Sequence, residues 1–586
     1  MNFNYDIMNR VSVFFINCVF LHFKKKIKKN FVYLFFYIKE INILNHIKKN
    51  IFNKDISILS SILINRFIKL NNILWKKKFI NKINSNKVIL VESFINHSGY
   101  TISNSIIALF LKKKFHLEIL GIVKKGDHVA KEIFKSYGID KCIIYPEANI
   151  FQRIKYTIIG LKILKKNTTI KDFSKIKYLK TDLGLTAYDS YIRYTGNPSL
   201  KNVNSELFYF LTDGIHACIF FNNLIKKNKI RYSVQAETAF LPSNTLFQMS
   251  LNKKIEIFSR LGVNNFAVRR YTDSKQKYDY RDKISKKIFN EIYRNNKKLC
   301  IKNFTKIQNE KIKTGKFGID VRVQHKRKIR PIINRSDLIK RLDWDNKKIG
   351  VIFMHHLIDK NFHSGPRKCF SDNYSWSKFI LQQLPNIKNV NWIIKPHPTE
   401  IYYGSKKDLK TEIEYLDKNF KHIKLFPEDL SQISLLNIAD YAISSNGSVG
   451  IEYPANGIPS IFIENSYFTH MNFLKKYNKS NNFLKAIKNL NKIKKPTKNT
   501  INKSKVFFYA RFNLFDNNCS LVPSHNISRD FNKNKFWIKN IEMIKKFRFE
   551  EDEFYQMLGL QLKYKLRHTV NFNKIKITKK IYNDFN

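Results

Sequence analysis

Short apolar runs alternate with longer amphipathic segments over two stretches of the chain. In the first stretch we expect strands at 87–92, 116–123, 142–145, 230–235 and 255–258, helices at 101–114, 129–137, 151–166 and 245–252, and a further apolar segment at 207–228. In the second we expect strands at 348–354, 390–394, 423–426, 441–444 and 460–463, and helices at 376–384, 409–419, 430–437 and 448–456. Strands that alternate with helices are typical of βαβ units and parallel sheets. The pattern therefore predicts an α/β protein.

The two stretches divide the chain into two Rossmann-like domains facing a cleft, with helical N- and C-terminal extensions. The expected regions are a basic helical region at 1–84, an N-terminal Rossmann-like domain at 85–270, a connector at 271–345, a C-terminal Rossmann-like domain at 346–475 and a basic helical region at 476–586. We expect the connector to contain a helix at 282–296 and a basic loop at 324–330. The last region includes a candidate return segment that packs on the first half.

Composition narrows the class of protein. The chain has 586 residues and a formal net charge of +62, scattered along its length. Such a charge has two explanations: a genome-wide bias toward lysine in protein composition, or attraction of the protein to a polyanion such as an anionic membrane surface. We find no nucleic-acid-binding module, and we expect no specific nucleic-acid partner. The six cysteines show no close pairing, which is typical of a reduced cytoplasmic protein.

The N-terminal region carries an apolar run at 11–23, followed by lysines and by aromatic residues at 31–37. The run is too short to cross a bilayer, which takes about 20 residues. Basic and aromatic residues interleave here, as they do in helices that lie on a membrane surface. The two interpretations are peripheral contact with the inner face of the plasma membrane and a packed helical layer.

Lys395-Pro-His-Pro398 ends an apolar strand with a cation and a histidine. The prolines stop the strand, because they lack the N–H that a sheet needs. In open parallel sheets, ligands bind at the carboxyl ends of strands. There, Lys395 and His397 would face a phosphate or sugar oxygen, and the alternative for His397 is a structural histidine.

A second polar turn follows the strand at 441–444. Short side chains and glycine let backbone N–H groups approach an anion, and the next helix adds its N-terminal dipole. We expect Ser448 to cap that helix, which alone would also account for the turn. Glu452, four residues later, is a candidate partner for ribose hydroxyls or for the helix dipole. The residues of this candidate anion site are Ser444, Ser445, Gly447, Ser448 and Glu452.

These motifs carry a family resemblance. The segments 389–400 and 439–459, with Phe353-Met-His-His-Leu-Ile-Asp359 and Phe370-Ser-Asp-Asn-Tyr-Ser-Trp376, resemble bacterial capsule polysaccharide biosynthesis glycosyltransferases of the Kdo-transferase-like and sialyltransferase-like kind. The resemblance covers roughly 348–475. It implies the GT-B fold, in which His397 and the Ser444–Ser445 turn bind the nucleotide phosphate of a sugar donor and Glu452 holds the ribose. It implies no metal and no cofactor, because the nucleotide-sugar is a substrate.

The N-terminal domain is expected to supply the catalytic base that deprotonates the acceptor hydroxyl. Asp213, in Phe210-Leu-Thr-Asp-Gly-Ile-His216, resembles the acidic-Gly motif of GT-B sialyltransferases but lacks its second acidic residue. Three other residues are alternative candidates for the base, because each ends or follows an expected strand. Two more, in the loop after 348–354, are candidates to line the cleft. The competitors are Glu92, His97 and Glu237, and the cleft candidates are His356 and Asp359.

The sequence thus predicts an enzyme that transfers a sugar from a CMP- or UDP-linked donor to a glycan or lipid-linked glycan of a surface polysaccharide. Two alternatives share the fold: a CDP-glycerol-type glycerophosphotransferase and a sugar-nucleotide epimerase. An alternative of another class is a non-catalytic, basic polyanion-binding protein.

Overall fold

The computed structural model describes residues 58–76, 86–95, 98–164, 169–261, 266–279, 283–314, 330–362, 365–397, 400, 405–515, 517–521, 533–548, 551–571 and 573–574. The described residues form two compact units, each assembled from three segments of the chain. Unit 1 takes those within Met1–Arg260, Tyr271–Lys277 and Asp530–Lys546. Unit 2 takes those within Leu261–Arg270, Tyr278–Arg529 and Phe547–Asn586.

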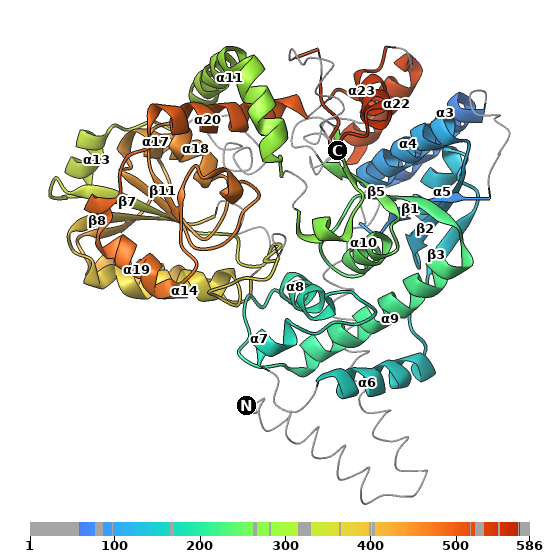
Figure 1. Ribbon diagram of the computed structural model, residues 1–586, viewed down its shortest axis with the longest axis horizontal. Helices are drawn as coiled ribbons and strands as arrows, with labels where there is room; N and C mark the ends of the chain where they lie inside the picture. Colours follow the sequence, from blue (N-terminus) through green and yellow to red (C-terminus); the bar gives the residue numbers. More distant parts are fainter. Residues whose placement is uncertain are drawn as a thin grey trace, which may run out of the picture. The chain divides into compact units, whose positions relative to one another are not determined.

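The first sheet, most of which lies in unit 1, has six strands in the order β3-β2-β1-β4-β5-β6 (Figure 1). They are β1 (Val88–Ser93), β2 (Glu118–Lys124), β3 (Cys142–Tyr145), β4 (Ile230–Gln235), β5 (Glu256–Leu261) and β6 (Ala267–Tyr271). β1 pairs in parallel with β2 and β4, β2 with β3, and β4 with β5. β1 reads as a continuous apolar run because it is central and covered on both sides, as parallel strands are.

Helices connect these strands. They are α4 (Ser98–Phe115), α5 (His128–Ser136), α6 (Ile150–Leu164), α7 (Ile170–Phe173), α8 (Leu183–Thr195), α9 (Ser205–Lys227) and α10 (Ser243–Asn252). Side chains cap the starts of some of them: Asp127 accepts the Ala130 N–H at 3.0 Å at the start of α5, and Asn204 accepts the Leu207 N–H at 2.8 Å at the start of α9. Such caps satisfy N–H groups that a helix leaves open.

Unit 1 is completed by a segment from late in the chain. The helix α22 (Lys533–Lys546) packs against α3 (Ile58–Lys76), with the Phe67 and Trp537 rings 5.2 Å apart. α3 also contacts α5, where the Asn71 amide donates to the Ser136 hydroxyl at 2.9 Å. This confirms the expected return segment.

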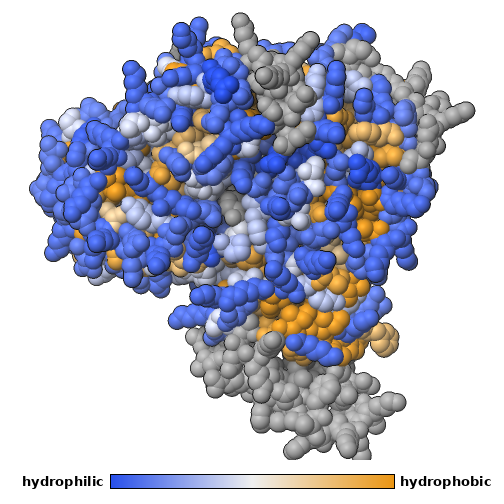
Figure 2. All heavy atoms as spheres, in the orientation of Figure 1, coloured by the Kyte–Doolittle hydropathy of each residue, from blue (hydrophilic) through white to orange (hydrophobic). Residues whose placement is uncertain are grey.

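Hydrophilic side chains cover most of the face shown in Figure 2, with apolar side chains gathered around α6. Phe151 of α6 is 79% exposed. Within the described part of the chain, no helix is both long enough and apolar enough to span a bilayer.

Unit 2 is built on a second six-stranded sheet, in the order β12-β11-β10-β7-β8-β9. Its strands are β7 (Lys348–Phe353), β8 (Val390–Lys395), β9 (Ile423–Leu425), β10 (Tyr441–Ser444), β11 (Ser460–Phe462) and β12 (Lys475–Lys476), and every pair is parallel. Gly350 of β7 leaves room for the indole of its register partner Trp392 on β8, because a Cβ at Gly350 would come within 2.4 Å of the indole. The prediction of two Rossmann-like α/β domains is confirmed by the two sheets.

The helices of unit 2 fall into two groups. Around the sheet are α13 (Arg335–Arg341), α14 (Asn373–Gln383), α16 (Lys410–Asn419), α17 (Leu435–Ile438), α18 (Val449–Ala455) and α19 (Ser480–Lys488). A second group comprises α11 (Lys286–Thr314), α20 (Lys498–Tyr509) and α23 (Glu553–Lys563). α20 packs against both α11 and α18, and Phe507 contributes to the aromatic core between them.

Several elements differ from the predicted ones. The helix expected at 282–296 continues to Thr314 as α11, because its apolar face packs on α20 despite a lysine-rich surface. The helix expected at 430–437 is a 3-10 turn (Gln432–Ser434) followed by the short α17. The elements α8, β6 and β12 were not predicted. Most of the expected basic loop at 324–330 and most of the region 1–84 lie outside the described residues.

Candidate functional site

The carboxyl ends of three neighbouring strands form the candidate site in unit 2. β7 lies between β10 and β8, so the loops after these strands meet at one edge of the sheet. His355 and His356 follow β7, His397 follows β8, and the turn 445–448 follows β10. The two motifs singled out in the sequence therefore flank a third loop.

His397 lies against the histidines of the β7 loop. Its ring centroid is 5.5 Å from that of His356 and 6.2 Å from that of His355. Lys395, the last residue of β8, is half-buried, with its Nζ 5.7 Å from the centre of the Phe426 ring. Burial lowers the pKa of Lys395 to about 8, and the positive charge of Arg330 adds to the effect. At neutral pH this group is therefore mostly a charged ammonium, and it gives up its proton near pH 8.

The turn after β10 is held by its own hydroxyl. Ser444 is buried, and its Oγ lies 2.9 Å from the Phe353 carbonyl oxygen and 2.7 Å from the Asn446 carbonyl oxygen. Ser445 is also buried, and its Oγ contacts the Asn446 amide oxygen at 3.5 Å. Gly447 has φ +112°, which side-chain-bearing residues rarely adopt. The hydroxyl of Ser444 therefore fastens the turn to the end of β7.

The expected cap at Ser448 is wrong. Ser448 occupies the N-cap position of α18, but its side chain makes no capping hydrogen bond and is exposed. Its backbone, at φ −66° and ψ −18°, is already helical, whereas a capping side chain needs an extended backbone to reach back to the helix N–H groups. Glu452 is half-buried in the first turn of α18.

His355 joins the two predicted motifs and was not singled out from the sequence. A Cβ placed on Gly447 would lie 3.8 Å from its Cδ2 and 3.9 Å from its Nε2. Its other ring nitrogen, Nδ1, lies 3.1 Å from the Asn373 amide nitrogen at the start of α14. The signals for it were its place in the segment 353–359, which carries the family resemblance, and its position just after an apolar strand.

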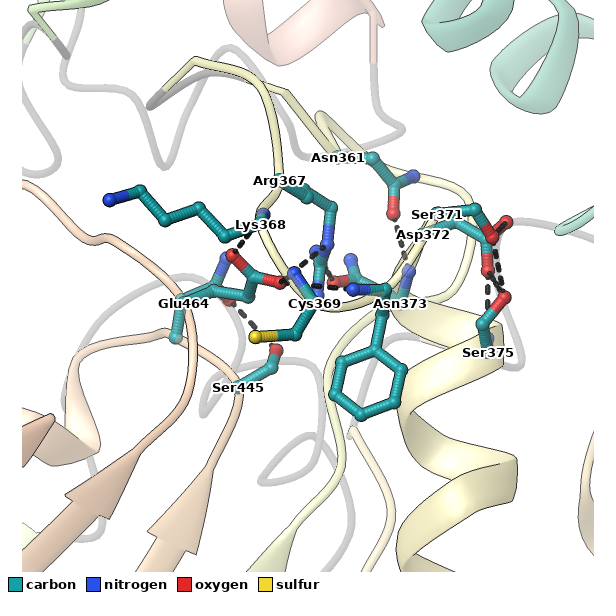
Figure 3. A network of polar contacts seen from close by, with 12 residues as sticks. Asn361, Arg367, Lys368, Cys369, Ser371, Asp372, Asn373, Ser375, Ser445 and Glu464 are labelled. Carbon is teal, nitrogen blue, oxygen red and sulfur yellow. Dashed lines mark hydrogen bonds and ion pairs between the residues drawn. The ribbon is translucent and has the colours of Figure 1, made fainter. Parts of the chain in front are cut away.

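Behind His355, a buried polar network links the loops after β7 and β11 (Figure 3). The Glu464 carboxylate accepts the backbone N–H groups of Lys368 and Cys369, each at 3.2 Å, and lies 3.8 Å from Arg367 Nε. Arg367 donates from Nη1 to the Asn373 amide oxygen at 2.5 Å. A small, solvent-open hollow of about 10 Å³ borders this network and is lined in part by Asn446, Arg367 and Glu464.

His356 and Asp359 shape the loop after β7. His356 is buried, and its Nδ1 accepts the Ile358 N–H at 3.2 Å and lies 3.6 Å from Glu400 Oε2. The same carboxylate oxygen accepts the Leu357 N–H at 3.1 Å. Burial raises the pKa of Glu400 to about 7. Asp359 is half-buried on the same loop.

Unit 1 has its own polar groups at the carboxyl edge of the first sheet. Glu92, the residue before the last of β1, is fully buried and accepts the N–H groups of Phe94 and Ala236, each at 2.7 Å. Burial raises its pKa to about 7. Glu237 accepts the N–H groups of Thr238 and Ala239 in its own loop, at 2.7 and 2.9 Å.

Asp213 lies within α9, and its carboxylate is 3.2 Å from Arg153 Nη2. The Asp213 side chain is 26% exposed, whereas that of Arg153 is 7% exposed and sits 5.0 Å from the centre of the Tyr209 ring. Asp213 thus combines solvent access with a neighbouring cation. His97 lies outside the described residues.

Among the described residues, no group of three or more His, Cys, Asp or Glu side chains is arranged to hold a metal ion. The histidines around His397 meet through their ring faces and edges.

The sequence matches no family model and no curated protein. Solved structures that resemble the chain include the β-Kdo 2,4 transferase KpsC of Thermosulfurimonas dismutans, 10% identical, with 54% of this chain and 88% of that chain covered and a TM-score of 0.30. The UDP-GlcNAc 2-epimerase of Neisseria meningitidis is 11% identical over 78% of this chain and 98% of that one, with a TM-score of 0.22. The wall teichoic acid polymerase TagF is 12% identical over 87% and 98%, with a TM-score of 0.21. Likenesses this weak carry no statement about what this chain binds or does.

Proposed function

We propose that the chain is a glycosyltransferase that binds the nucleotide phosphate of a CMP- or UDP-linked sugar at the β10–β7–β8 edge of unit 2. One observation supports this most: His397, His355 and the Gly447 turn come from three adjacent strand ends, and His355 neighbours both of the others, with its ring centroid 6.2 Å from that of His397 and its Cδ2 3.8 Å from where a Cβ on Gly447 would lie. Ligands of open parallel sheets bind at such strand ends.

The chemistry of the edge suits a departing nucleotide. When the bond from sugar to phosphate breaks, negative charge grows on the phosphate oxygens, and fixed donors and cations that face these oxygens lower the barrier. Lys395 supplies a cation whose pKa is about 8, and His355 and His397 supply donors. This set of groups needs no metal to neutralise the charge, so the proposed transfer is metal-independent.

Asp213 is the proposed base for the acceptor hydroxyl, by its resemblance to an acidic-Gly motif and by its partial exposure beside Arg153. The acceptor is proposed to be a glycan or lipid-linked glycan of a surface polysaccharide. Deprotonation of a hydroxyl by a placed carboxylate is a standard way to activate an acceptor.

A ligand screen tests the nucleotide site. The melting temperature of the protein is measured with CMP, UDP, CDP and GDP, because a ligand that binds only the folded state raises it. We expect one pyrimidine nucleotide to raise it in the wild type and His397→Ala to lower the affinity for that nucleotide on the order of tenfold or more, since a hydrogen bond to a charged group is lost.

The matched control is His128→Ala, which removes an exposed histidine at the start of α5 in unit 1. It should bind the nucleotide as the wild type does. No stabilisation by any of the four nucleotides, or equal affinity of His397→Ala and wild type, would contradict the proposed site. Once a nucleotide is identified, mass analysis of the product separates sugar transfer from transfer of a phosphoalcohol and from rearrangement of the sugar.

A further inference from the structure

We propose that Arg367 and Asn373 are positioning residues that hold His355 neutral with its proton on Nε2, so that this nitrogen donates a hydrogen bond to a phosphate oxygen bound at the Gly447 turn. The phosphate part of this inference rests on the proposed function. The positioning part rests on the hydrogen-bond network alone.

The first step is the orientation of the Asn373 amide. Its oxygen and nitrogen are distinguished by what they face, because a guanidinium group only donates. Arg367 Nη1 lies 2.5 Å from Asn373 Oδ1, so the amide oxygen must be on that side. Arg367 is itself held by the buried Glu464 carboxylate, 3.8 Å from its Nε. The NH2 group of Asn373 must therefore face the loop after β7.

The second step is the ring of His355. The Asn373 NH2 group donates to the His356 carbonyl oxygen at 2.9 Å and lies 3.1 Å from His355 Nδ1. An NH2 group has only donors, so Nδ1 must accept and cannot carry a proton. A neutral imidazole then has its proton on Nε2, and an imidazolium would set two N–H groups against each other.

A second contact of His355 Nδ1 would favour the other neutral tautomer. His355 Nδ1 lies 3.4 Å from the His356 carbonyl oxygen, which would accept a hydrogen bond from an Nδ1–H group in the other tautomer. That arrangement would place the proton against the Asn373 NH2 group at the shorter distance of 3.1 Å. The shorter contact is therefore the one that must be satisfied, and it selects the tautomer with the proton on Nε2.

The third step is what Nε2 faces. This edge of the ring lies beside Gly447, where a Cβ would be 3.9 Å from Nε2. The hollow beside the network is lined by Asn446 of the same turn. The titratable and charged groups around His355 include His356 beside it in the chain, His397, with ring centroids 6.2 Å apart, and Arg367 behind Asn373. A neutral N–H donor here would serve an anion without adding another charge beside these groups.

The positioning part is tested by nitrogen-15 NMR of histidine-labelled full-length protein, in which long-range proton–nitrogen correlations distinguish the two neutral tautomers from the imidazolium. The His355 signals are assigned by their loss in His355→Ala. We expect the wild type at pH 7 to show the neutral tautomer with the proton on Nε2. A proton on Nδ1, alone or together with one on Nε2, would overturn the proposal.

Asn373→Asp makes the test independent of a general loss of structure. An aspartate keeps an acceptor for Arg367 but offers its second oxygen to His355, so we expect Nδ1 to become protonated. Asn361→Asp is the matched control, because the Asn361 amide oxygen accepts the Asn373 backbone N–H at 2.8 Å and an aspartate can do the same. It should keep the wild-type His355 signals. Unchanged signals in Asn373→Asp would refute the role of Asn373.

The ligand part is tested by calorimetry with CMP and UDP on wild type and His355→Ala. We expect on the order of tenfold weaker binding by the variant, since one hydrogen bond to a charged oxygen is lost. Equal affinity would overturn the donor role of His355. If the wild type binds neither nucleotide, the proposed function and the phosphate part fail together, and the NMR result still decides whether Arg367 and Asn373 fix the ring.

Discussion

Glu92 links the ends of β1 and β4 through a carboxyl group that water does not reach. Its oxygens accept the N–H groups of Phe94 and Ala236 at 2.7 Å each, yet burial raises its pKa from an ordinary value of 4.5 to about 7. The folded state therefore holds a proton that the unfolded chain releases between these two values. Replacing Glu92 with glutamine, which does not titrate, isolates this effect.

The sign and the size follow from the two pKa values. Below pH 4.5 the carboxyl is protonated in both states, and between pH 4.5 and 7 the unfolded state binds fewer protons, so stability falls as pH rises. At about 1.4 kcal/mol per pKa unit, the fall approaches roughly 3 kcal/mol above pH 7. Glutamine also sets an NH2 group against a backbone N–H, which costs about 1–3 kcal/mol at every pH.

The assay is urea-induced unfolding of the wild type and Glu92→Gln at several pH values from 4.5 to 8. We expect the stability advantage of the wild type over the variant to shrink by about 3 kcal/mol over this range. Other groups that titrate here, such as Glu400, are present in both proteins and cancel. The control is Glu118→Gln on β2, whose side chain is 31% exposed and pairs with Lys141 at 2.7 Å, and which should follow the wild-type profile. If Glu92→Gln follows it too, the account of the buried carboxyl is wrong.

Four further predictions concern both units. Gly447→Ala should weaken nucleotide binding by calorimetry, because φ +112° strains any side-chain-bearing residue and shifts the turn against His355; wild-type affinity would contradict this. Burial opposes ionisation of Asp440, but the Ile349 N–H, Arg335 and Lys348 outweigh it and lower the pKa of Asp440. Asp440→Asn should therefore reduce the free energy of unfolding in urea by about 1–3 kcal/mol near pH 7, and by less as the pH falls below 4. An equal loss at all pH values would argue against the ion pair. Asp213→Asn should reduce turnover with little change in donor affinity, and a fully active variant would remove it as the base. Deleting residues 1–40 should reduce sedimentation with anionic vesicles, whereas an unchanged bound fraction would count against membrane contact.

Most strands of both sheets could be predicted because they are short apolar runs that end in polar residues. β3 and β10 have the predicted bounds, and the bounds of β7 and β8 differ from the predicted ones by one residue. β6 was missed because Arg269 and Arg270 interrupt it. Arg269 is nevertheless buried, since Asp279 pairs with it at 3.2 Å, and such a partner is invisible before the chain folds.

The candidate site was predicted in part. Lys395, His397 and the Gly447 turn stand out because they follow strands at both edges of the site. The groups that bring these residues together do not stand out in the sequence. His355 acquires its place from the strand order, in which β7 separates β8 from β10. Arg367 and Glu464 are far apart in the sequence, and only the folded loops bring them within 3.8 Å. No periodicity or spacing in the sequence predicts this contact between Arg367 and Glu464.

The helix α22 has a consequence for how the protein is made. Its partner α3 is among the first described helices to leave the ribosome, whereas α22 emerges only after all of the second sheet has been synthesised. During that interval the surface around Phe67, which Trp537 covers in the finished protein, stays open to water and to other chains. Unit 1 is thus completed only after the second sheet has been synthesised. A nascent chain stopped before residue 533 should therefore be prone to aggregation or to capture by chaperones.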